Sequence, residues 1–361
     1  MITHYGWSLD LQRDFAPHAA RGHVPGRITV QQRGLYRLIS DYGELAAEVS
    51  GRLVHEAAET GLPVTGDWVA LAPRPEEAAA TIHTVLPRSS LFVRKAAHQN
   101  AAQAVAANVD LALLTASLNA DLNPRRMERY LATAWDSGAK PVVVLTKADA
   151  CPDPEALAAA IQEVAVGVEV LIVSSVTGRG LEALAALLPP GRTAVLLGSS
   201  GVGKSTLVNA LAGGELMATG VIREADAHGR HTTTHRELIL LPSGALLLDT
   251  PGMRELGLWQ AQAGVDTVFA DVQHEIDALA QGCRFRDCDH GHEPDCAVRA
   301  ALEDGRLDEA RWNSWLKLGR ELAHLERRED PEARAAHRKL WIGVSKAQRA
   351  GKQRRQREWD D

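Results

Sequence analysis

The sequence predicts a multidomain α/β protein, and three observations lead to this class. Short segments rich in valine, isoleucine, tyrosine and tryptophan, separated by glycines, occupy the N-terminal part. Long apolar runs alternate with alanine-rich stretches in the middle, and polar stretches with helical character follow. A chain of 361 residues has room for two or three domains. We therefore expect domains over residues 1–95, 96–262 and 263–361.

The N-terminal domain is expected to be a small β-barrel of the OB type. Its strand-like segments are GRITVQQRGLYRLIS, ELAAEVSGRLV and GDWVALAP, with glycines between them. Evenly spaced short strands with turn residues between them are typical of small barrels. A generic β domain is the alternative. The stretch from Arg94 to Asn108 reads as a connector with some helix.

Five continuous apolar runs define the central domain. They are VDLALLTAS, PVVVLTKAD, VEVLIVSS, TAVLLGSS and ALLLDTPG, and alanine-rich helical stretches separate most of them. Buried parallel strands with crossover helices produce this pattern. The central domain is therefore expected to be an α/β unit of the nucleotide-binding kind.

Composition limits the function classes. The formal net charge is −6, which argues against a wholly basic nucleic-acid binder. No apolar run is long enough to cross a membrane, and the N-terminus lacks the pattern of a signal peptide. Three of the four cysteines lie within residues 283–296, without the paired spacing of a disulfide scaffold. We expect a cytoplasmic protein with no membrane partner.

A phosphate loop follows the fourth apolar run. The segment GSSGVGKST fits the pattern G-x-x-x-x-G-K-[ST], and it lies between an apolar strand and a helical segment, as that motif requires. Lys204 supplies a charge to the β- and γ-phosphates, and Ser205 offers a hydroxyl to Mg²⁺. The expected phosphate-binding residues are Gly198, Ser199, Ser200, Gly201, Val202, Gly203, Lys204, Ser205 and Thr206.

A second phosphate motif, DTPG, ends the fifth apolar run. Asp249 is placed to hold the Mg²⁺ shell, and Gly252 can offer its N–H to the γ-phosphate. Between the two motifs, a threonine could reach Mg²⁺ when the γ-phosphate is present. We expect Thr233 in this role, although the adjacent Thr232 and Thr234 compete for it.

The segment TKAD, after the second apolar run, predicts a loop that recognises guanine. Asp149 can accept the N1–H and 2-amino donors of guanine, and a buried carboxylate that other bases leave unpaired makes the choice strong. Lys147 would lie along the base, and Thr146 stands where the more usual NKxD loop has asparagine. A third loop follows VEVLIV and is expected to face the guanine oxygen with Ser174, Ser175 and Val176.

These motifs occur in an unusual order, because the base-reading loops precede the phosphate loop. Their order predicts a circularly permuted P-loop GTPase domain, the same sheet cut and rejoined elsewhere, which is geometrically feasible because domain termini often lie close together. DTPG then lies directly before the C-terminal region. A nucleotide-driven movement of residues 250–259 could therefore act on the C-terminal region.

The catalytic residue is not the usual glutamine after DxxG, because Met253 occupies that position. His231, between the two phosphate motifs, is the best candidate to orient the attacking water. His228 and His235 flank it, and a group supplied by a partner is the alternative.

A cysteine cluster with the spacing C-x4-C-x-H-x5-C predicts a closed, structural Zn²⁺ site. Its ligands are Cys283, Cys288, His290 and Cys296, with His292 as the rival fourth ligand. The chain then ends in a basic segment, residues 346–357, which indicates either a solvated helix face or contact with RNA phosphates.

These segments together resemble the RsgA (YjeQ) family over nearly the whole chain. The resemblance rests on the GDWV-bearing barrel, RKAA followed by AANVD, TKAD, GSSGVGKST, GRHTTTHREL, DTPGMRELGLW and the cysteine cluster. It implies an N-terminal OB-type β-barrel, a circularly permuted P-loop GTPase domain and a C-terminal, mostly helical zinc-binding domain. The implied cofactors are GTP or GDP, Mg²⁺ and one structural Zn²⁺.

The resemblance also implies a function and a partner. The family hydrolyses GTP slowly alone and faster on the small (30S) ribosomal subunit, late in subunit maturation. Its histidine before the threonine run is implicated in hydrolysis, and His231 matches it. We expect a monomer that contacts the subunit and its rRNA. The alternatives are an RNA-binding module that uses nucleotide as a static clamp, and an ATPase or small-molecule kinase.

Overall fold

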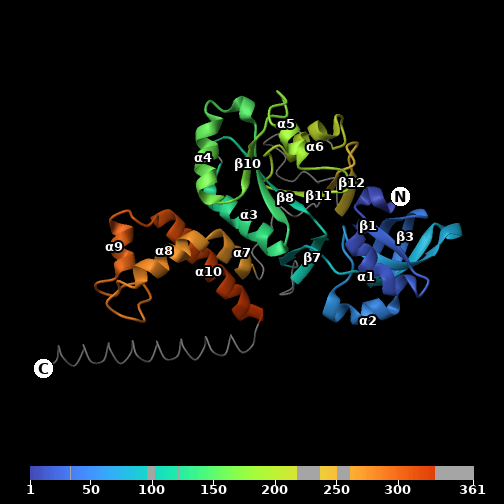
Figure 1. The fold of residues 1–361 in the computed structure, drawn as a ribbon, viewed down its shortest axis with the longest axis horizontal. Coiled ribbons are helices and arrows are strands. Elements are labelled where there is room, and N and C mark those ends of the chain that lie inside the picture. The colour runs from blue at the N-terminus through green and yellow to red at the C-terminus, as the bar shows by residue number, and fades with distance from the viewer. Residues whose placement is uncertain (33, 96–101, 120–121, 218–235, 250–260, 330–361) are drawn as a thin grey trace, which may run out of the picture.

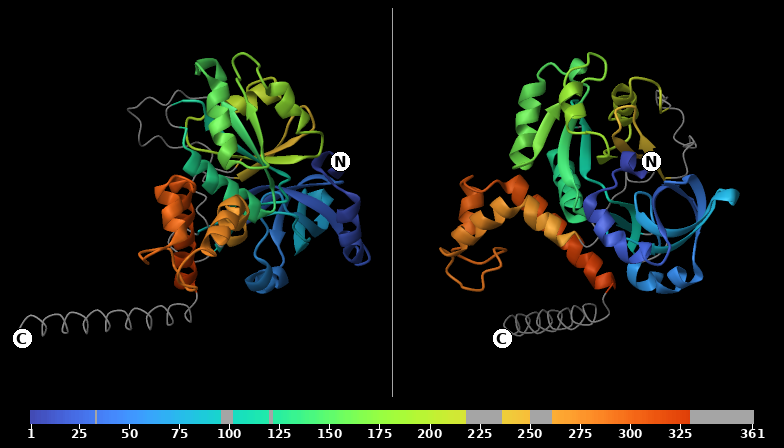
Figure 2. Two further views of the ribbon diagram at one scale, coloured as in Figure 1. Left: turned by 60° about the vertical axis from the view of Figure 1, so that its left-hand side comes forward. Right: turned by 45° about the vertical axis from the view of Figure 1, so that its right-hand side comes forward.

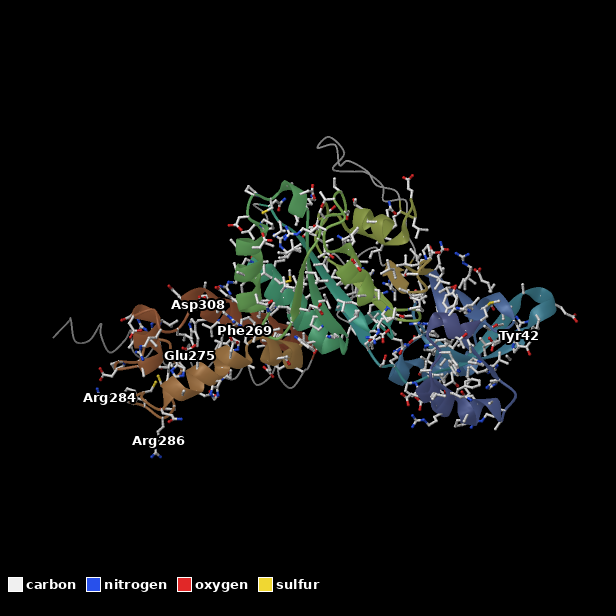
Figure 3. All side chains as sticks on the ribbon, turned by 45° about the horizontal axis from the view of Figure 1, so that its top comes forward. Tyr42, Phe269, Glu275, Arg284, Arg286 and Asp308 are labelled. Carbon is white, nitrogen blue, oxygen red and sulfur yellow. The ribbon has the colours of Figure 1, made fainter. Side chains whose placement is uncertain are left out.

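The computed structural model describes residues 1–32, 34–95, 102–119, 122–217, 236–249 and 261–329. The chain forms three parts in a row: an N-terminal barrel, a central α/β unit and a group of C-terminal helices (Figure 1). In the two further views of Figure 2, the barrel and the C-terminal helices lie on different sides of the central unit. Figure 3 places Tyr42 of the barrel and Arg284 of the C-terminal part at opposite ends of an elongated molecule.

The N-terminal part is a closed five-stranded barrel. The strands are β1 (Val24–Gln32), β2 (Leu35–Ser40), β3 (Gly43–Val49), β4 (Trp68–Arg74) and β5 (Ala79–Val85). They follow the order β1-β2-β3-β5-β4, and β4 pairs back onto β1. Only the β3–β5 pairing is parallel. This Greek-key closure is that of an OB-type barrel, so the predicted fold of this part is confirmed.

Two helices accompany the barrel, and apolar side chains fill it. Helix α1 (Leu9–Ala19) precedes β1, and α2 (Gly51–Thr60) connects β3 to β4. Alternate strand residues point inward, and the fully buried Ile28, Leu38 and Ile82 belong to one apolar cluster. The alternation of inward and outward residues explains why the sequence reads as strands in this region.

A β-hairpin joins the barrel to the central unit. Strand β6 (Leu91–Lys95) pairs with β7 (Ala102–Ala107) in a separate two-stranded sheet. The expectation of helix in this connector was wrong within its described residues. Alanine favours helix intrinsically, but Val105 and Ala106 are buried, and their packing outweighs that weak preference. The hairpin spans the domain boundary expected at residue 95.

The central sheet contains the five predicted apolar runs as parallel strands. These are β8 (Leu111–Ser117), β9 (Lys140–Thr146), β10 (Glu169–Ile172), β11 (Thr193–Leu197) and β13 (Leu246–Asp249). Their order is β10-β9-β8-β11-β13, and β12 (Arg236–Leu240) adds an antiparallel strand beside β13. Helices α3 (Pro124–Ser137), α4 (Pro154–Val164), α5 (Leu181–Ala186) and α6 (Lys204–Ala212) connect them. The prediction of a nucleotide-type α/β unit is confirmed.

The barrel and the central sheet are one continuous sheet. Strand β12 pairs antiparallel with β1, which makes eleven strands in all. Arg27 lies buried at this seam, and its guanidinium donates to Asn108 O at 3.0 Å and to Thr193 Oγ1 at 2.9 Å. Burial lowers the pKa of Arg27 to about 10, so the side chain stays charged at neutral pH.

The C-terminal part is helical, as predicted. It comprises α7 (Gln262–Val268), α8 (Ala270–Ala280), α9 (Ala297–Glu303) and α10 (Glu309–Glu329), and α7 and α10 pack on α3 (Figure 1). The contact with α7 is close, because a Cβ on Gly264 would come within 2.0 Å of Ala132 O. The basic segment 346–357 lies outside the described residues.

Candidate functional site: one edge of the central sheet

Three of the predicted loops meet at one edge of the central sheet. Strands β8, β9, β10 and β11 are parallel, so their carboxyl ends lie at the same edge. The TKAD loop follows β9, the SSVTG loop follows β10, and the phosphate loop follows β11. Ligands of open α/β sheets bind at this edge. The order of the loops along the chain therefore does not prevent them from forming one site.

The phosphate loop has the shape that its glycines require. It begins after β11 and ends at Lys204, the first residue of α6. Gly198 has φ 154°, and a Cβ there would lie 2.2 Å from Thr115 O on the neighbouring strand. Gly203, with φ 95°, caps α6 in a left-handed conformation. The helix N-terminus and the loop N–H groups then suit a phosphate anion.

Lys204 crosses the phosphate loop. Its Nζ donates to Gly198 O at 2.7 Å and Ser199 O at 2.6 Å. Ser205 lies in the first turn of α6 and is half-buried, which suits the hydroxyl that Mg²⁺ would need. The remaining loop residues are Ser200, Gly201 and Thr206, which are exposed, and Val202, which is buried.

The base-reading loop is tied to the phosphate loop. Thr146 Oγ1 lies 2.5 Å from Val202 O, to which it can donate, and 3.2 Å from Ala116 O. Lys147 has φ 60°, and its Nζ donates to Gly201 O at 2.7 Å. Thr146 thus supplies the tether between the two loops, although the more usual loop has asparagine at its position.

Asp149 differs from expectation in its exposure. Its carboxylate is exposed rather than buried, and Ser174 Oγ donates to its Oδ1 at 2.5 Å. Ser174 is itself buried and accepts hydrogen bonds from the N–H groups of Val176 and Thr177 at 3.2 and 3.1 Å. A carboxylate has about four lone-pair sites, so Asp149 retains acceptor capacity for two guanine donors. In the same loop, Ser175 is half-buried and the side chain of Val176 is 78% exposed.

Several predicted residues are not described. His231, Thr233 and Gly252 lie outside the described residues, with the competing threonines and histidines. Asp249 is the last residue of β13, and β13 runs parallel to β11. Its backbone therefore lies at the edge that carries the phosphate loop, consistent with the expected place of a Mg²⁺ carboxylate.

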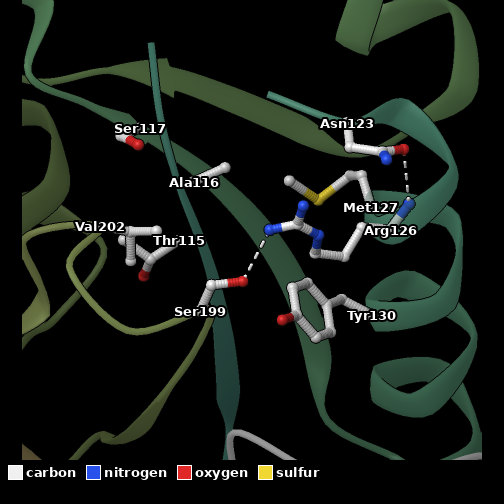
Figure 4. A pocket seen from close by; sticks show the side chains of 9 residues that line it. All are labelled: Thr115, Ala116, Ser117, Asn123, Arg126, Met127, Tyr130, Ser199 and Val202. Carbon is white, nitrogen blue, oxygen red and sulfur yellow. Dashed lines mark hydrogen bonds between the residues drawn. The ribbon is translucent and has the colours of Figure 1, made fainter. Parts of the chain in front are cut away.

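Sequence reasoning missed one residue at this edge. Arg126, in the first turn of α3, donates from Nη1 to Ser199 Oγ of the phosphate loop at 2.8 Å. The two side chains meet in a small pocket between α3, the end of β8 and the phosphate loop (Figure 4). The two residues are 73 positions apart. No local motif marks such a contact, so only the folded chain reveals it.

The cysteine cluster lies in the C-terminal part, away from this edge. The ligand atoms of Cys283, Cys288, His290 and Cys296 all lie within 4.8 Å of one another. His290 Nδ1 lies 3.7 Å from Cys283 Sγ and 3.5 Å from Cys296 Sγ, and the two Sγ atoms are 3.9 Å apart. A tetrahedral Zn²⁺ with Zn–S bonds of about 2.3 Å needs sulfur atoms about 3.8 Å apart. The residues present therefore fit this metal, with His290 rather than His292 in the group.

The fold and the loops at the sheet edge define a circularly permuted P-loop GTPase. The RsgA GTPase family model matches residues 85–259. A small ribosomal subunit biogenesis GTPase RsgA of Opitutus terrae is 46% identical over 360 residues, 97% of each chain. The protein of the same name from Streptomyces avermitilis is 45% identical over 362 residues, covering 99% of this chain and 95% of that one. The chain belongs to the RsgA GTPase family.

Solved structures agree on the fold. The crystal structure of YjeQ from Thermotoga maritima matches with a TM-score of 0.58 at 24% identity, over 83% of this chain and 98% of that chain. YloQ, described as a circularly permuted GTPase, matches with a TM-score of 0.56 at 23% identity, over 83% and 95%. The predicted permuted fold is confirmed.

Family membership also confirms the predicted class of enzyme, a GTP phosphohydrolase, and implies that it binds guanine nucleotide with Mg²⁺. Among the helices that the structure describes, none has the length and apolar character needed to cross a membrane.

Proposed function

We propose that this protein binds the small ribosomal subunit and hydrolyses GTP to GDP and phosphate during late subunit maturation. The observation that carries the enzymatic part is the direct tether of the base loop to the phosphate loop through Thr146 and Lys147. The names of the relatives, small ribosomal subunit biogenesis GTPases, support the choice of partner. Such a factor would work where ribosomal subunits mature, in the cytoplasm, as a monomer in contact with rRNA.

In this proposal each loop has one task. Asp149 accepts the two guanine donors, and the loop of Ser174, Ser175 and Val176 faces the guanine oxygen. The N–H groups of residues 198–206 and the Lys204 ammonium hold the β- and γ-phosphates, with the Gly252 N–H on the γ-phosphate. Bound Mg²⁺ supplies charge neutralisation for the phosphate oxygens.

The Mg²⁺ side of the site would be formed by Ser205, Thr233 and Asp249. Hydrolysis also needs a group that orients the attacking water, because phosphoryl transfer depends on positioning more than on covalent chemistry. His231 takes that role in this proposal, since neutral imidazole can accept a proton from water at physiological pH.

The cysteine cluster would hold one structural Zn²⁺. Four protein ligands close a tetrahedral site and leave no open position for substrate. The S···S and S···N separations support this assignment. The ion would hold together the loop between α8 and α9, because a loop of mostly exposed polar residues has little apolar surface to bury.

The test is phosphate release from GTP, measured with purified small subunits, with large subunits and with neither. We expect strong stimulation by small subunits only, and none in Lys204→Ala, which lacks the phosphate-binding ammonium. Turnover that small subunits leave unchanged would contradict the proposed partner. A wild-type protein that binds GTP without turnover would support the static clamp instead.

A further inference from the structure

Helix α3 contacts the phosphate loop at its N-terminal end, and α7 and α10 of the C-terminal part also pack against it. Its N-terminal turn is held by Asn123, whose Oδ1 accepts from the N–H groups of Arg125 and Arg126 at 2.9 and 3.3 Å. From this turn Arg126 reaches Ser199 Oγ, as Figure 4 shows. Ser199 is one of the two residues whose carbonyls accept from Lys204. Arg126 therefore acts on the part of the loop that also orients the phosphate-binding lysine.

Helix α3 also makes polar side-chain contacts with α10. Glu128 has a fully buried side chain, and it accepts from Ser314 Oγ at 2.5 Å. The next residue, Arg129, donates through both Nη atoms to the Glu321 carboxylate, at 2.7 and 2.6 Å. Paired bonds of this kind fix direction as well as distance. Helix α10 is thereby joined to α3 by side chains that lie next to Arg126 in the sequence.

A third contact extends the network into α8. Arg311 of α10 donates to both carboxylate oxygens of Asp271, at 2.8 and 3.0 Å, and its Nε lies 3.8 Å from Glu128 Oε1. Helix α7 also packs closely on α3, because its Gly264 lies against the backbone of Ala132. An α-helix has 3.6 residues per turn, so Arg126, Glu128 and Arg129 lie within one turn of α3. A shift of α7 and α10 would therefore also move Arg126 relative to the phosphate loop.

We propose that Arg126 is a positioning residue for the nucleotide site, and that α3 couples it to the C-terminal helices. The hydrogen bond to Ser199 holds the phosphate loop in its nucleotide-binding shape. A partner that displaces α10 would move α3 and change how firmly the loop holds nucleotide. This inference rests on the proposed function for the identity of the nucleotide. It adds a route of communication separate from the chain connection at residues 250–260.

The first experiment measures release of a fluorescent GDP analogue from the full-length protein alone. Arg126→Ala and Ser199→Ala should each speed release about threefold to tenfold, the range expected for one hydrogen bond. Because both remove the same bond, the double variant should be no faster than the faster single variant. Arg126→Lys, which keeps a charged donor, should recover part of the loss. The control is Arg52→Ala, which removes an exposed arginine paired with Glu56 on α2 and should not change release.

The second experiment tests the coupling. Glu321→Ala removes the partner of Arg129 and should speed release about twofold in the wild-type background, as one weaker and partly exposed contact would. In the Arg126→Ala background it should have no effect, because the link to the loop is already lost.

Three outcomes would overturn the inference. They are release from Arg126→Ala at the wild-type rate, multiplicative effects of Arg126→Ala and Ser199→Ala, or an effect of Glu321→Ala that persists without Arg126. A changed unfolding temperature with unchanged release would show a merely structural role, and would overturn it as well. A wild-type protein that binds no GDP would instead refute the proposed function, so the two failures are distinguishable.

Discussion

The central α/β unit is joined to its two neighbours in different ways. At the barrel, main-chain pairing joins β12 to β1 in one sheet, and the buried Arg27 donates to groups on both sides of the seam. At the C-terminal helices, the polar part of the connection consists of side chains on α3 and α10: the buried Glu128 accepts from Ser314, and Arg129 pairs with Glu321. The side chains of Arg129 and Glu321 are 27% and 34% exposed. A main-chain strand ladder has one register, whereas side-chain contacts such as the partly exposed Arg129–Glu321 pair contribute little each and can be exchanged. We infer that the barrel is a fixed extension of the sheet and that the C-terminal helices are the adjustable side.

Removal of a ligand from the cysteine cluster should have the largest effect on metal binding and local folding. Cys288→Ser should lose stoichiometric zinc, because binding to structural sites contributes on the order of 10 kcal/mol to the folding of such regions. Residues 270–303 should then become sensitive to protease while the barrel and the central sheet stay resistant. Metal analysis and limited proteolysis would measure both effects. Cys151→Ser is the matched control, since Cys151 is not in the cluster, and zinc retained by Cys288→Ser would refute the ligand set.

Loss of Arg27 should be the next most damaging change. Arg27→Met removes the donor that the structure gives to Asn108 O and Thr193 Oγ1 and one of the two donors to Gly66 O. Each buried acceptor left without a donor costs about 1–3 kcal/mol. Urea denaturation should show this loss. Arg37→Met, which breaks an exposed pair with Glu44, should cost no more than about 1 kcal/mol. Equal losses in the two variants would contradict the distinction between a fixed seam and an adjustable surface.

The α3–α7 contact gives a smaller, more local prediction. Gly264→Ala places a Cβ against Ala132 O and should destabilise the protein by about 1–3 kcal/mol through overpacking. Gly319→Ala on α10 meets no atom within 4 Å and should be neutral, or stabilising by up to about 1 kcal/mol through helix propensity. Urea denaturation would compare them. Similar shifts in both variants would mean that α7 does not pack on α3 as described.

The smallest predicted effect is the contribution of Glu128 to the pH dependence of the free energy of unfolding. Burial raises the pKa of Glu128 above its ordinary value of 4.5, and its contacts with Ser314, Arg125 and Arg311 only partly oppose this shift. A carboxyl group with a raised pKa in the folded state binds protons more tightly when folded. Stability should therefore rise as the pH falls from neutral through that raised pKa toward 4.5. The free energy of unfolding of the wild type, relative to Glu128→Gln, should increase from pH 7 to pH 5. A decrease would contradict the assignment.

Local patterns predicted which loops gather at the edge of the central sheet, because each loop is continuous in sequence. The phosphate loop, TKAD and the cysteine cluster each carry their chemistry within a few residues, and the apolar runs between them became the parallel strands. The permuted order could be predicted for the same reason. The exposure of Asp149 could not, because it depends on how the TKAD loop packs on its neighbours rather than on its own residues.

The contacts that join the domains were not predictable from local sequence. Arg126 and Ser199 are 73 residues apart, and Arg27 and Thr193 are 166 apart. The segment of β7 was expected to be a connector with some helix, because alanine favours helix intrinsically. Its pairing with β6 makes it a strand instead. In each case the deciding interaction is tertiary, and one sequence gives no signal for it.

If the motifs in permuted order form one guanine-nucleotide site, exchange of the base-reading carboxylate should change which nucleotide the protein uses. Asp149→Asn replaces an acceptor with a donor, so kcat/KM should fall for GTP by about 100-fold or more and rise for xanthosine triphosphate. Asp153→Asn, four residues on at the start of α4, is the matched control and should keep the wild-type preference. If the kcat/KM of Asp149→Asn for GTP equalled that of the wild type, Asp149 would not be the residue that selects guanine.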